Sequence, residues 1–350
     1  MKRNKLFKLF VVVLSIGTIA LMSSCKGDDG AMGPAGAAGT DGANGTDGTP
    51  GVDGNEVCLQ CHNVTKKSDV TADYLTSVHA TGGAVSYAGG RYGCAKCHSD
   101  QGFRETQYTG EDTTAANILS PQPIQCGTCH DFHQSLDFAN EPNYALRTVK
   151  PVDLLMYRSA DPTADPVTID LGPEANTCAN CHQPRRLPPN STDDSTAVTS
   201  THYGPHYGTQ STTLSGLGAY EIGTGYPDPG EGSPHATSAV CTTCHMHGGE
   251  HTWEPNLESC NTSTCHNGAL TSVSENSRQI TFRTLMSTLE SELKDAGLLD
   301  ADGTPVKGTF ETDEVGALYN YRWLYSDHSS GTHNFPYSET LLNNSIAVFQ

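Results

Sequence analysis

The chain has 350 residues, a formal net charge of -19 at pH 7 and a hydrophobic content of only 35%. The negative charge argues against nucleic acid or anionic lipid as a binding partner, and it favours cationic partners, mineral surfaces or oxidised metal ions. With 36 glycines and 19 prolines, the chain also has little aliphatic material for a large core of its own.

Residues 1–24 have the pattern of an export signal. A positive start precedes an apolar segment, Leu9 to Met22, that is too short to span a membrane comfortably. The end of this segment, Leu21-Met-Ser-Ser-Cys25, resembles a bacterial lipobox, which implies lipid modification of Cys25. An ordinary secretory signal with an incidental cysteine is the alternative. Under either interpretation we expect the chain to leave the cytoplasm. The positive residues are Lys2, Arg3, Lys5 and Lys8.

Residues 25–54 contain a three-residue repeat. Glycine occupies every third position from Gly27 to Gly54, which is the Gly-x-y period of collagen. Only Pro34 and Pro50 stiffen the repeat, and a stable triple helix needs more imino acids. We therefore expect a flexible spacer behind the lipid anchor, with a homotrimer as the alternative.

A Cys-x-x-Cys-His motif recurs through residues 55–266. Cys-x-x-Cys-His is the attachment site of a c-type haem, in which two thiols form thioethers to the porphyrin and the histidine ligates the iron. Zinc sites and disulfide frameworks also use paired cysteines, but neither requires a histidine after the second cysteine of every pair. The sequence therefore predicts six haem c groups. The motif cysteines are Cys58, Cys61, Cys94, Cys97, Cys126, Cys129, Cys178, Cys181, Cys241, Cys244, Cys260 and Cys265, and only the last pair has a longer spacer.

The histidines of the motifs are the predicted proximal iron ligands. A second histidine would saturate each iron and leave electron transfer as its main chemistry, whereas an open position would let a substrate bind. Nine further histidines are available for the six remaining positions. The proximal ligands are His62, His98, His130, His182, His245 and His266.

Local context ranks the other nine histidines. His79 lies on an expected short helix between the first two motifs, and His133 follows the third motif closely enough to serve a neighbouring haem. The segment from Thr201 to Gly268 resembles the distal-ligand pattern of multihaem c-type cytochromes, and Gly331-Thr-His333-Asn-Phe-Pro-Tyr337 resembles their C-terminal signature. This resemblance implies distal ligands at His202, His235, His251 and His333. We expect His206, His247 and His328 not to bind iron.

The resemblance also implies a fold class. We expect a mainly α-helical and irregular multihaem cytochrome c, with a haem-packed core and little sheet over residues 55–266. Residues 267–350 should form helices that cap haems and supply one distal ligand. An apolar face from Phe282 to Leu293 predicts one helix ending near Gly297, and further helices are expected over 313–325 and from Pro336 onward.

The lipobox, the acidic residues after it and the Gly-x-y spacer together resemble the N-termini of bacterial outer-surface multihaem cytochromes. That resemblance implies electron transfer at the cell surface, outer membrane or outside the cell, and not an enzyme. Expected partners are other redox proteins or extracellular acceptors, and a lipid membrane through the N-terminal anchor. Two alternatives stay open: a multihaem reductase of nitrite, hydroxylamine or a sulfur oxyanion with one open haem, and a subunit of a polymeric cytochrome filament.

Overall fold

The computed structural model describes residues 54–133, 135–137, 144–161 and 163–350. The expected signal, the lipidation site at Cys25 and nearly all of the spacer lie outside the described residues. Residues 54–350 form one compact unit. No helix within the described residues is long and apolar enough to cross a membrane.

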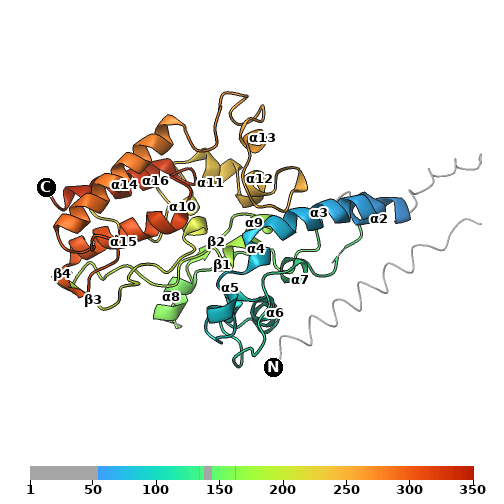
Figure 1. The fold of residues 1–350 in the computed structure, drawn as a ribbon, viewed down its shortest axis with the longest axis horizontal. Coiled ribbons are helices and arrows are strands. Elements are labelled where there is room, and N and C mark those ends of the chain that lie inside the picture. Colours follow the sequence, from blue (N-terminus) through green and yellow to red (C-terminus); the bar gives the residue numbers. More distant parts are fainter. Residues whose placement is uncertain (1–53, 134, 138–143, 162) are drawn as a thin grey trace, which may run out of the picture. The chain divides into compact units, whose positions relative to one another are not determined.

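Short helices joined by irregular segments make up the region that carries the motifs (Figure 1). Many of these helices have only one or two turns, because glycine, proline and the motifs themselves interrupt the chain. In order, they are α2 (Gly54–His62), α3 (Val64–Thr76), α4 (Val78–Thr81), the π-helix η1 (Val85–Gly89), α5 (Ala95–His98), α6 (Asp100–Thr109), α7 (Cys126–Cys129), α8 (Leu155–Ala160), α9 (Pro173–Ala179), α10 (Gln210–Ser215), α11 (Pro234–Ser238), α12 (Cys241–His245), the 3-10 helix η2 (His247–Gly249) and α13 (Leu257–Cys260).

The described residues contain two small antiparallel sheets of two strands each. β1 (Val152–Asp153) pairs with β2 (Thr168–Ile169), and β3 (Ser195–Val198) pairs with β4 (Gly308–Glu311). The second sheet joins the C-terminal region to the segment that follows the fourth motif. The prediction of a mainly α-helical and irregular fold with little sheet is therefore confirmed.

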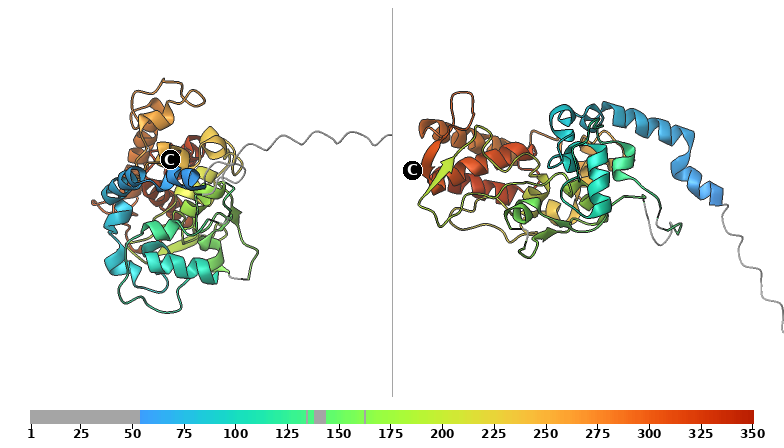
Figure 2. Two further views of the ribbon diagram at one scale, coloured as in Figure 1. Left: turned by 90° about the vertical axis from the view of Figure 1, so that its right-hand side faces the viewer. Right: turned by 90° about the horizontal axis from the view of Figure 1, so that it is seen from below.

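Three longer helices follow the last motif: α14 (Ser277–Asp295), α15 (Thr312–Asp327) and α16 (Phe335–Ala347). Asn276 starts α14 with a capping box completed by Gln279, and Asn334 caps α16 beside Pro336. α14 contains the apolar face expected from Phe282 to Leu293, and α16 begins beside Pro336 as expected. The three helices pack against one another, with α10 against α15 (Figures 1 and 2).

The main hydrophobic core of the described residues lies chiefly among these helices, and it extends to α9, which begins the fourth motif, through Ala175 and Ala179. Its largest fully buried side chains include Trp323, Tyr319, Tyr337 and Leu318. Thr213 accepts a hydrogen bond from the Trp323 indole, which ties α10 to the C-terminal half of α15. The expected apolar faces of these helices are present, but they pack mainly against one another. The C-terminal region thus supplies a rigid support beside the motifs.

Candidate haem-binding sites

The six motifs lie on short helical turns. A turn of helix places residues three apart on one face, so the two thiols of a Cys-x-x-Cys pair point the same way. α2, α5, α7 and α12 each carry part or all of one motif, while the fourth and sixth motifs run from α9 and α13 into turns. All twelve motif cysteines are free thiols. In the five motifs with a two-residue spacer, both thiols and the following histidine are therefore available to one planar ligand.

Each motif histidine faces a second histidine from another part of the chain. We number the sites 1 to 6 by the motif that supplies the first histidine. The ring centres of the six pairs are between 6.1 and 6.4 Å apart. The pairs are His62–His133 at site 1, His98–His206 at site 2, His130–His251 at site 3, His182–His79 at site 4, His245–His333 at site 5 and His266–His235 at site 6.

This separation fits one iron between two imidazoles. A ligating imidazole nitrogen lies about 2 Å from a metal ion and about 1 Å from its own ring centre, so ring centres across one metal stand about 6 Å apart. Imidazoles in direct contact would be closer, and unrelated ones would scatter. The described residues contain no group of three or more His, Cys, Asp or Glu side chains arranged to hold a metal ion. Each site thus offers two protein ligands, which suits a porphyrin that brings four nitrogens of its own.

Five of the six histidines expected as second ligands face a motif histidine. These are His79, His133, His235, His251 and His333. His133 faces the first motif and not its own, as its position just after the third motif indicated. The longer spacer of the sixth motif leaves its histidine pair at 6.2 Å, within the range of the other five.

Site 2 differs from the sequence-based expectation. The histidine that faces His98 is His206, at 6.2 Å, and His202 takes part in none of the six pairs. The main-chain amides of Arg185 and Arg186 donate to the carbonyl of Pro205, which fixes the chain just before His206. His206 has a positive φ of 67° and its ring faces His98, whereas His202 is exposed. The structure therefore places His206, and not the expected His202 four residues before it, opposite His98.

A cavity of about 360 Å³ supports the assignment of His206. Its lining includes Cys94 and His98 from the second motif together with His206. Arg91 and Arg185 also line it and could pair with carboxylates of a bound group. A second cavity, of about 680 Å³, lies beside His62 at site 1.

Burial keeps several of the paired histidines neutral, as a metal ligand must be. Burial lowers the pKa of His79 to about 4, with a contribution from His182. Burial also lowers the pKa of His206 to about 4, helped by the positive charge of Arg185. His333 is the exception, because the carboxylate of Asp327 outweighs the effect of burial and raises the pKa.

The outer ring nitrogens are held by hydrogen bonds. Fixing Nδ1 with an acceptor leaves Nε2 to face the metal and sets the ring orientation. Five of the described Nδ1 contacts end on uncharged oxygens, and one ends on a carboxylate. The acceptors are the carbonyls of Tyr144 for His130, Thr332 for His235, Trp253 for His245 and Gly249 for His251, then Oε1 of Gln210 for His182 and Oδ1 of Asp327 for His333.

Contacts between motifs show which sites are neighbours. Sγ of Cys97 in motif two is 3.8 Å from the carbonyl oxygen of Asn180 in motif four. Sγ of Cys181 in motif four is likewise 3.8 Å from the carbonyl oxygen of Lys96 in motif two. Motifs two and four therefore lie side by side. A hydrogen bond with Cys241 and burial raise the pKa of Cys178, which places motif five beside motif four.

Two more pairs of sites are neighbours. Burial raises the pKa of Cys244 to about 11, and the nearby thiols of Cys260 and Cys265 add to the shift, so site 6 adjoins site 5. His133 of site 1 follows His130 of site 3 by three residues. Sites 1 and 3 are therefore close neighbours.

Trp253 lies where three sites meet, and nothing in the sequence singled it out. Its indole is 4.6 Å from the ring of His79 at site 4 and 5.5 Å from that of His251 at site 3. Its carbonyl accepts the Nδ1 hydrogen bond of His245 at site 5, 2.7 Å away. Sites 3, 4 and 5 are thereby joined by one residue.

No protein-family model matches the chain, and no curated protein matches it. Among solved structures, the crystal structure of the outer cell wall cytochrome OcwA is similar, with a TM-score of 0.49 and 20% sequence identity. The similarity covers 79% of this chain and 50% of the OcwA chain, so this chain spans about half the length of that protein. A likeness of this size does not by itself assign a function.

Proposed function

We propose that this protein carries electrons through six covalently attached haem c groups, each held between two histidines of the same chain. The observation that carries the proposal is the set of six histidine pairs. Every pair contains one motif histidine, and all six separations fall between 6.1 and 6.4 Å. Six independent matches to one ligation distance have no simpler physical cause.

The chain's own residues would have three tasks at each site. The cysteines would fix the position of the group, the two histidines would ligate its iron, and the Nδ1 acceptors would orient the imidazole rings. The bound haem iron supplies one-electron chemistry. Because no axial position would remain open, the arrangement favours an electron carrier over the reductase alternative.

The neighbouring sites support a path along the molecule. Sites 1, 3, 4, 5 and 6 form a row, and site 2 branches from site 4 through the reciprocal contacts of Cys97 and Cys181. An electron entering at either end would pass from site to neighbouring site. The physiological setting that fits the N-terminal sequence is the cell surface, with lipidation at Cys25, redox proteins or extracellular acceptors as partners, and no nucleic acid.

The haem count and the spin state test this proposal together. The mass of the intact purified protein should equal that of the processed chain plus six haems. Electron paramagnetic resonance of the oxidised protein should then show low-spin iron alone, because two histidines saturate each centre. Carbon monoxide added to the reduced protein should leave the visible spectrum unchanged. A high-spin signal or a carbon monoxide complex would sink the carrier assignment and favour a reductase with an open site.

A further inference from the structure

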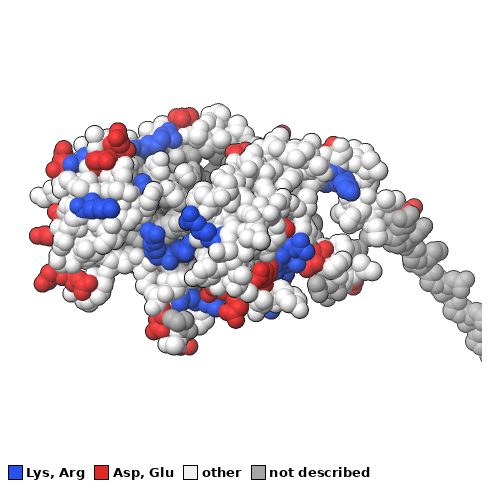
Figure 3. Space-filling model, turned by 60° about the horizontal axis from the view of Figure 1, so that its bottom comes forward, with Lys and Arg blue, Asp and Glu red and all other residues white. Residues whose placement is uncertain are grey.

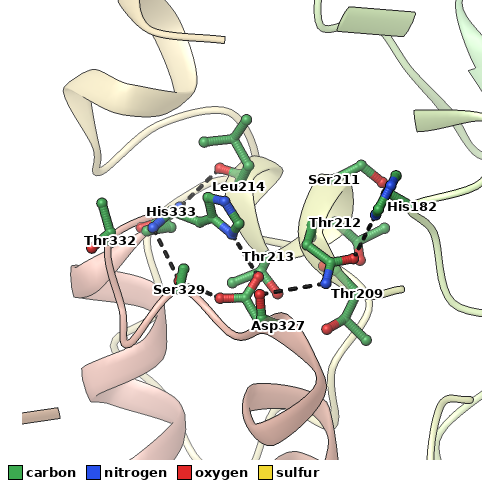
Figure 4. Close-up of polar contacts among 12 residues, drawn as sticks. His182, Thr209, Ser211, Thr212, Thr213, Leu214, Asp327, Ser329, Thr332 and His333 are labelled. Atoms are coloured by element: carbon green, nitrogen blue, oxygen red, sulfur yellow. Dashed lines mark hydrogen bonds and ion pairs between the residues drawn. The ribbon is translucent and has the colours of Figure 1, made fainter. Parts of the chain in front are cut away.

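At site 5 the Nδ1 atom of His333 contacts a carboxylate, whereas the other described Nδ1 contacts end on uncharged oxygens. Oδ1 of Asp327 accepts the Nδ1 hydrogen bond of His333 at 2.6 Å, and the Asp327 side chain is fully buried. Oδ2 of Asp327 accepts from the Ser329 hydroxyl, which also accepts from the His333 amide (Figure 4). Both carboxylate oxygens are therefore committed to holding His333.

The position of Asp327 is unfavourable for a carboxylate in two respects. It is the last residue of α15, where the helix dipole repels negative charge, and it is removed from water. Among the ion pairs of the described residues, none joins Asp327 to a lysine or arginine. A buried charge placed against the dipole needs compensation, and the iron that His333 would ligate is a cationic centre that could supply it.

The adjacent site receives a neutral partner through the same polar cluster. Gln210 offers Oε1 to His182 of site 4 at 3.3 Å, and its Nε2 donates to the carbonyl of Ser326 at 2.9 Å. Figure 4 shows His333 and His182 on opposite sides of this cluster. Two neighbouring sites are thus supported by one cluster, with a carboxylate on one side and an amide on the other.

We infer that Asp327 is a positioning residue that holds the reduction potential of site 5 below those of its neighbours, sites 4 and 6. Charge-assisted hydrogen bonds are roughly twice as strong as neutral ones. Asp327 stabilises the oxidised state of the site more than the reduced state, since reduction by one electron removes positive charge opposite the carboxylate. At site 6 the one Nδ1 acceptor among the described residues is the carbonyl of Thr332 at His235, so site 5 would be a step between two higher-potential sites.

The test compares Asp327→Asn with the unaltered, fully haem-loaded protein in a potentiometric titration followed by absorbance and paramagnetic resonance. Asparagine keeps the shape and an oxygen acceptor but loses the charge. One of the six reduction steps should move upward by at least tenfold in its equilibrium constant, which is about 59 mV for one electron. The other five steps should stay in place, and all iron should remain low-spin.

Asp313→Asn is the matched control. Asp313 accepts a hydrogen bond from Tyr220 in the first turn of the same helix, about 21 Å along the axis from Asp327 by helical rise. Removing this carboxylate should shift no step. If Asp327→Asn keeps six low-spin haems and no step moves upward, the inference is wrong.

A second variant keeps the question answerable if Asp327→Asn loads haem poorly. Ser329→Ala retains the carboxylate but removes the hydroxyl that shares its charge, so the step of site 5 should move downward. An unmoved or raised step would overturn the inference. It rests on the proposed function, whose failure would be seen separately as fewer than six haems or as high-spin iron in the unaltered protein.

Discussion

His206 reaches its partner because the chain before it is anchored. The carbonyl of Pro205 accepts hydrogen bonds from two consecutive main-chain amides. The next residue, His206, has a positive φ. A positive φ at a residue other than glycine destabilises the fold by about 1–3 kcal/mol when the backbone is strained. Such a conformation persists only where the surrounding contacts impose it. At site 2 those contacts aim one histidine at another.

This geometry predicts opposite outcomes for two histidines four residues apart. His206→Ala should leave one iron with a single protein ligand and give a high-spin signal from about one-sixth of the iron. His202→Ala should leave the spectrum unchanged, because His202 is exposed and faces no motif histidine. Paramagnetic resonance of the two oxidised variants checks this. A high-spin signal in His202→Ala alone would restore the original sequence-based assignment.

The residues that sequence patterns found and missed differ in a physical way. The motif cysteines and histidines are set by covalent chemistry at fixed spacing, so they are readable in the sequence itself. Three residues take part in the sites because of how the loops fold in three dimensions. They are His206 as a facing histidine, Trp253 through its carbonyl and Asp327 through its carboxylate. The spacing of the motifs carries no record of the two Nδ1 contacts at site 5, one made across 8 residues by His245 and the other across 6 residues by His333.

At the scale of elements, α5 is held against α6 by a glycine. A Cβ built on Gly102 would lie 2.2 Å from the carbonyl oxygen of Ala95, inside the second motif. Glycine therefore lets α6 approach the short helix that carries Cys97 and His98. The position of site 2 depends on this close approach.

Gly102→Ala is expected to weaken haem loading at site 2. Alanine at a free helical position would gain up to about 1 kcal/mol in helix propensity, but overpacking costs about 1–3 kcal/mol and should win here. The mass of the intact protein should show molecules that lack one haem. Gly93→Ala is the control, since a Cβ there meets nothing within 4 Å. Full loading of Gly102→Ala with unchanged thermal stability would contradict the expectation.

The C-terminal helices were more predictable than the region before them. The 3.6-residue periodicity of Phe282, Leu289 and Leu293 and the cap at Asn276 lie within one segment, and all three apolar side chains are buried. The helices of the motif region are too short to show a period. Their positions follow from contacts between distant segments, which one sequence read alone does not display.

Across the whole molecule, the histidine pairs join distant parts of the chain. His79 meets His182, and His245 meets His333, so each completed site would close a long loop. Six such links leave few segments of the described chain untied. Acidic and basic side chains are interspersed on the face in Figure 3, so the net charge of the chain does not translate into a uniformly acidic surface there.

The same pairing bears on the filament alternative. All twelve histidines of the six pairs come from one chain, so every proposed site would be complete without a neighbouring molecule. A filament built by sharing a ligand would instead leave one site of an isolated subunit short of a histidine. His202, His247 and His328 stand outside the pairs, but none of the six sites requires them.

Dilution of the protein should therefore leave the ligation and the spin state of the iron unchanged. We expect native mass spectrometry to find a monomer with six haems, and paramagnetic resonance of the same dilute sample to show only low-spin iron. Association between subunits weakens with dilution by mass action, whereas ligation within a chain does not. His247→Ala serves as the control for an unpaired histidine and should alter neither result. A high-spin signal that grows on dilution and disappears on concentration would show that a site borrows its ligand from a second chain.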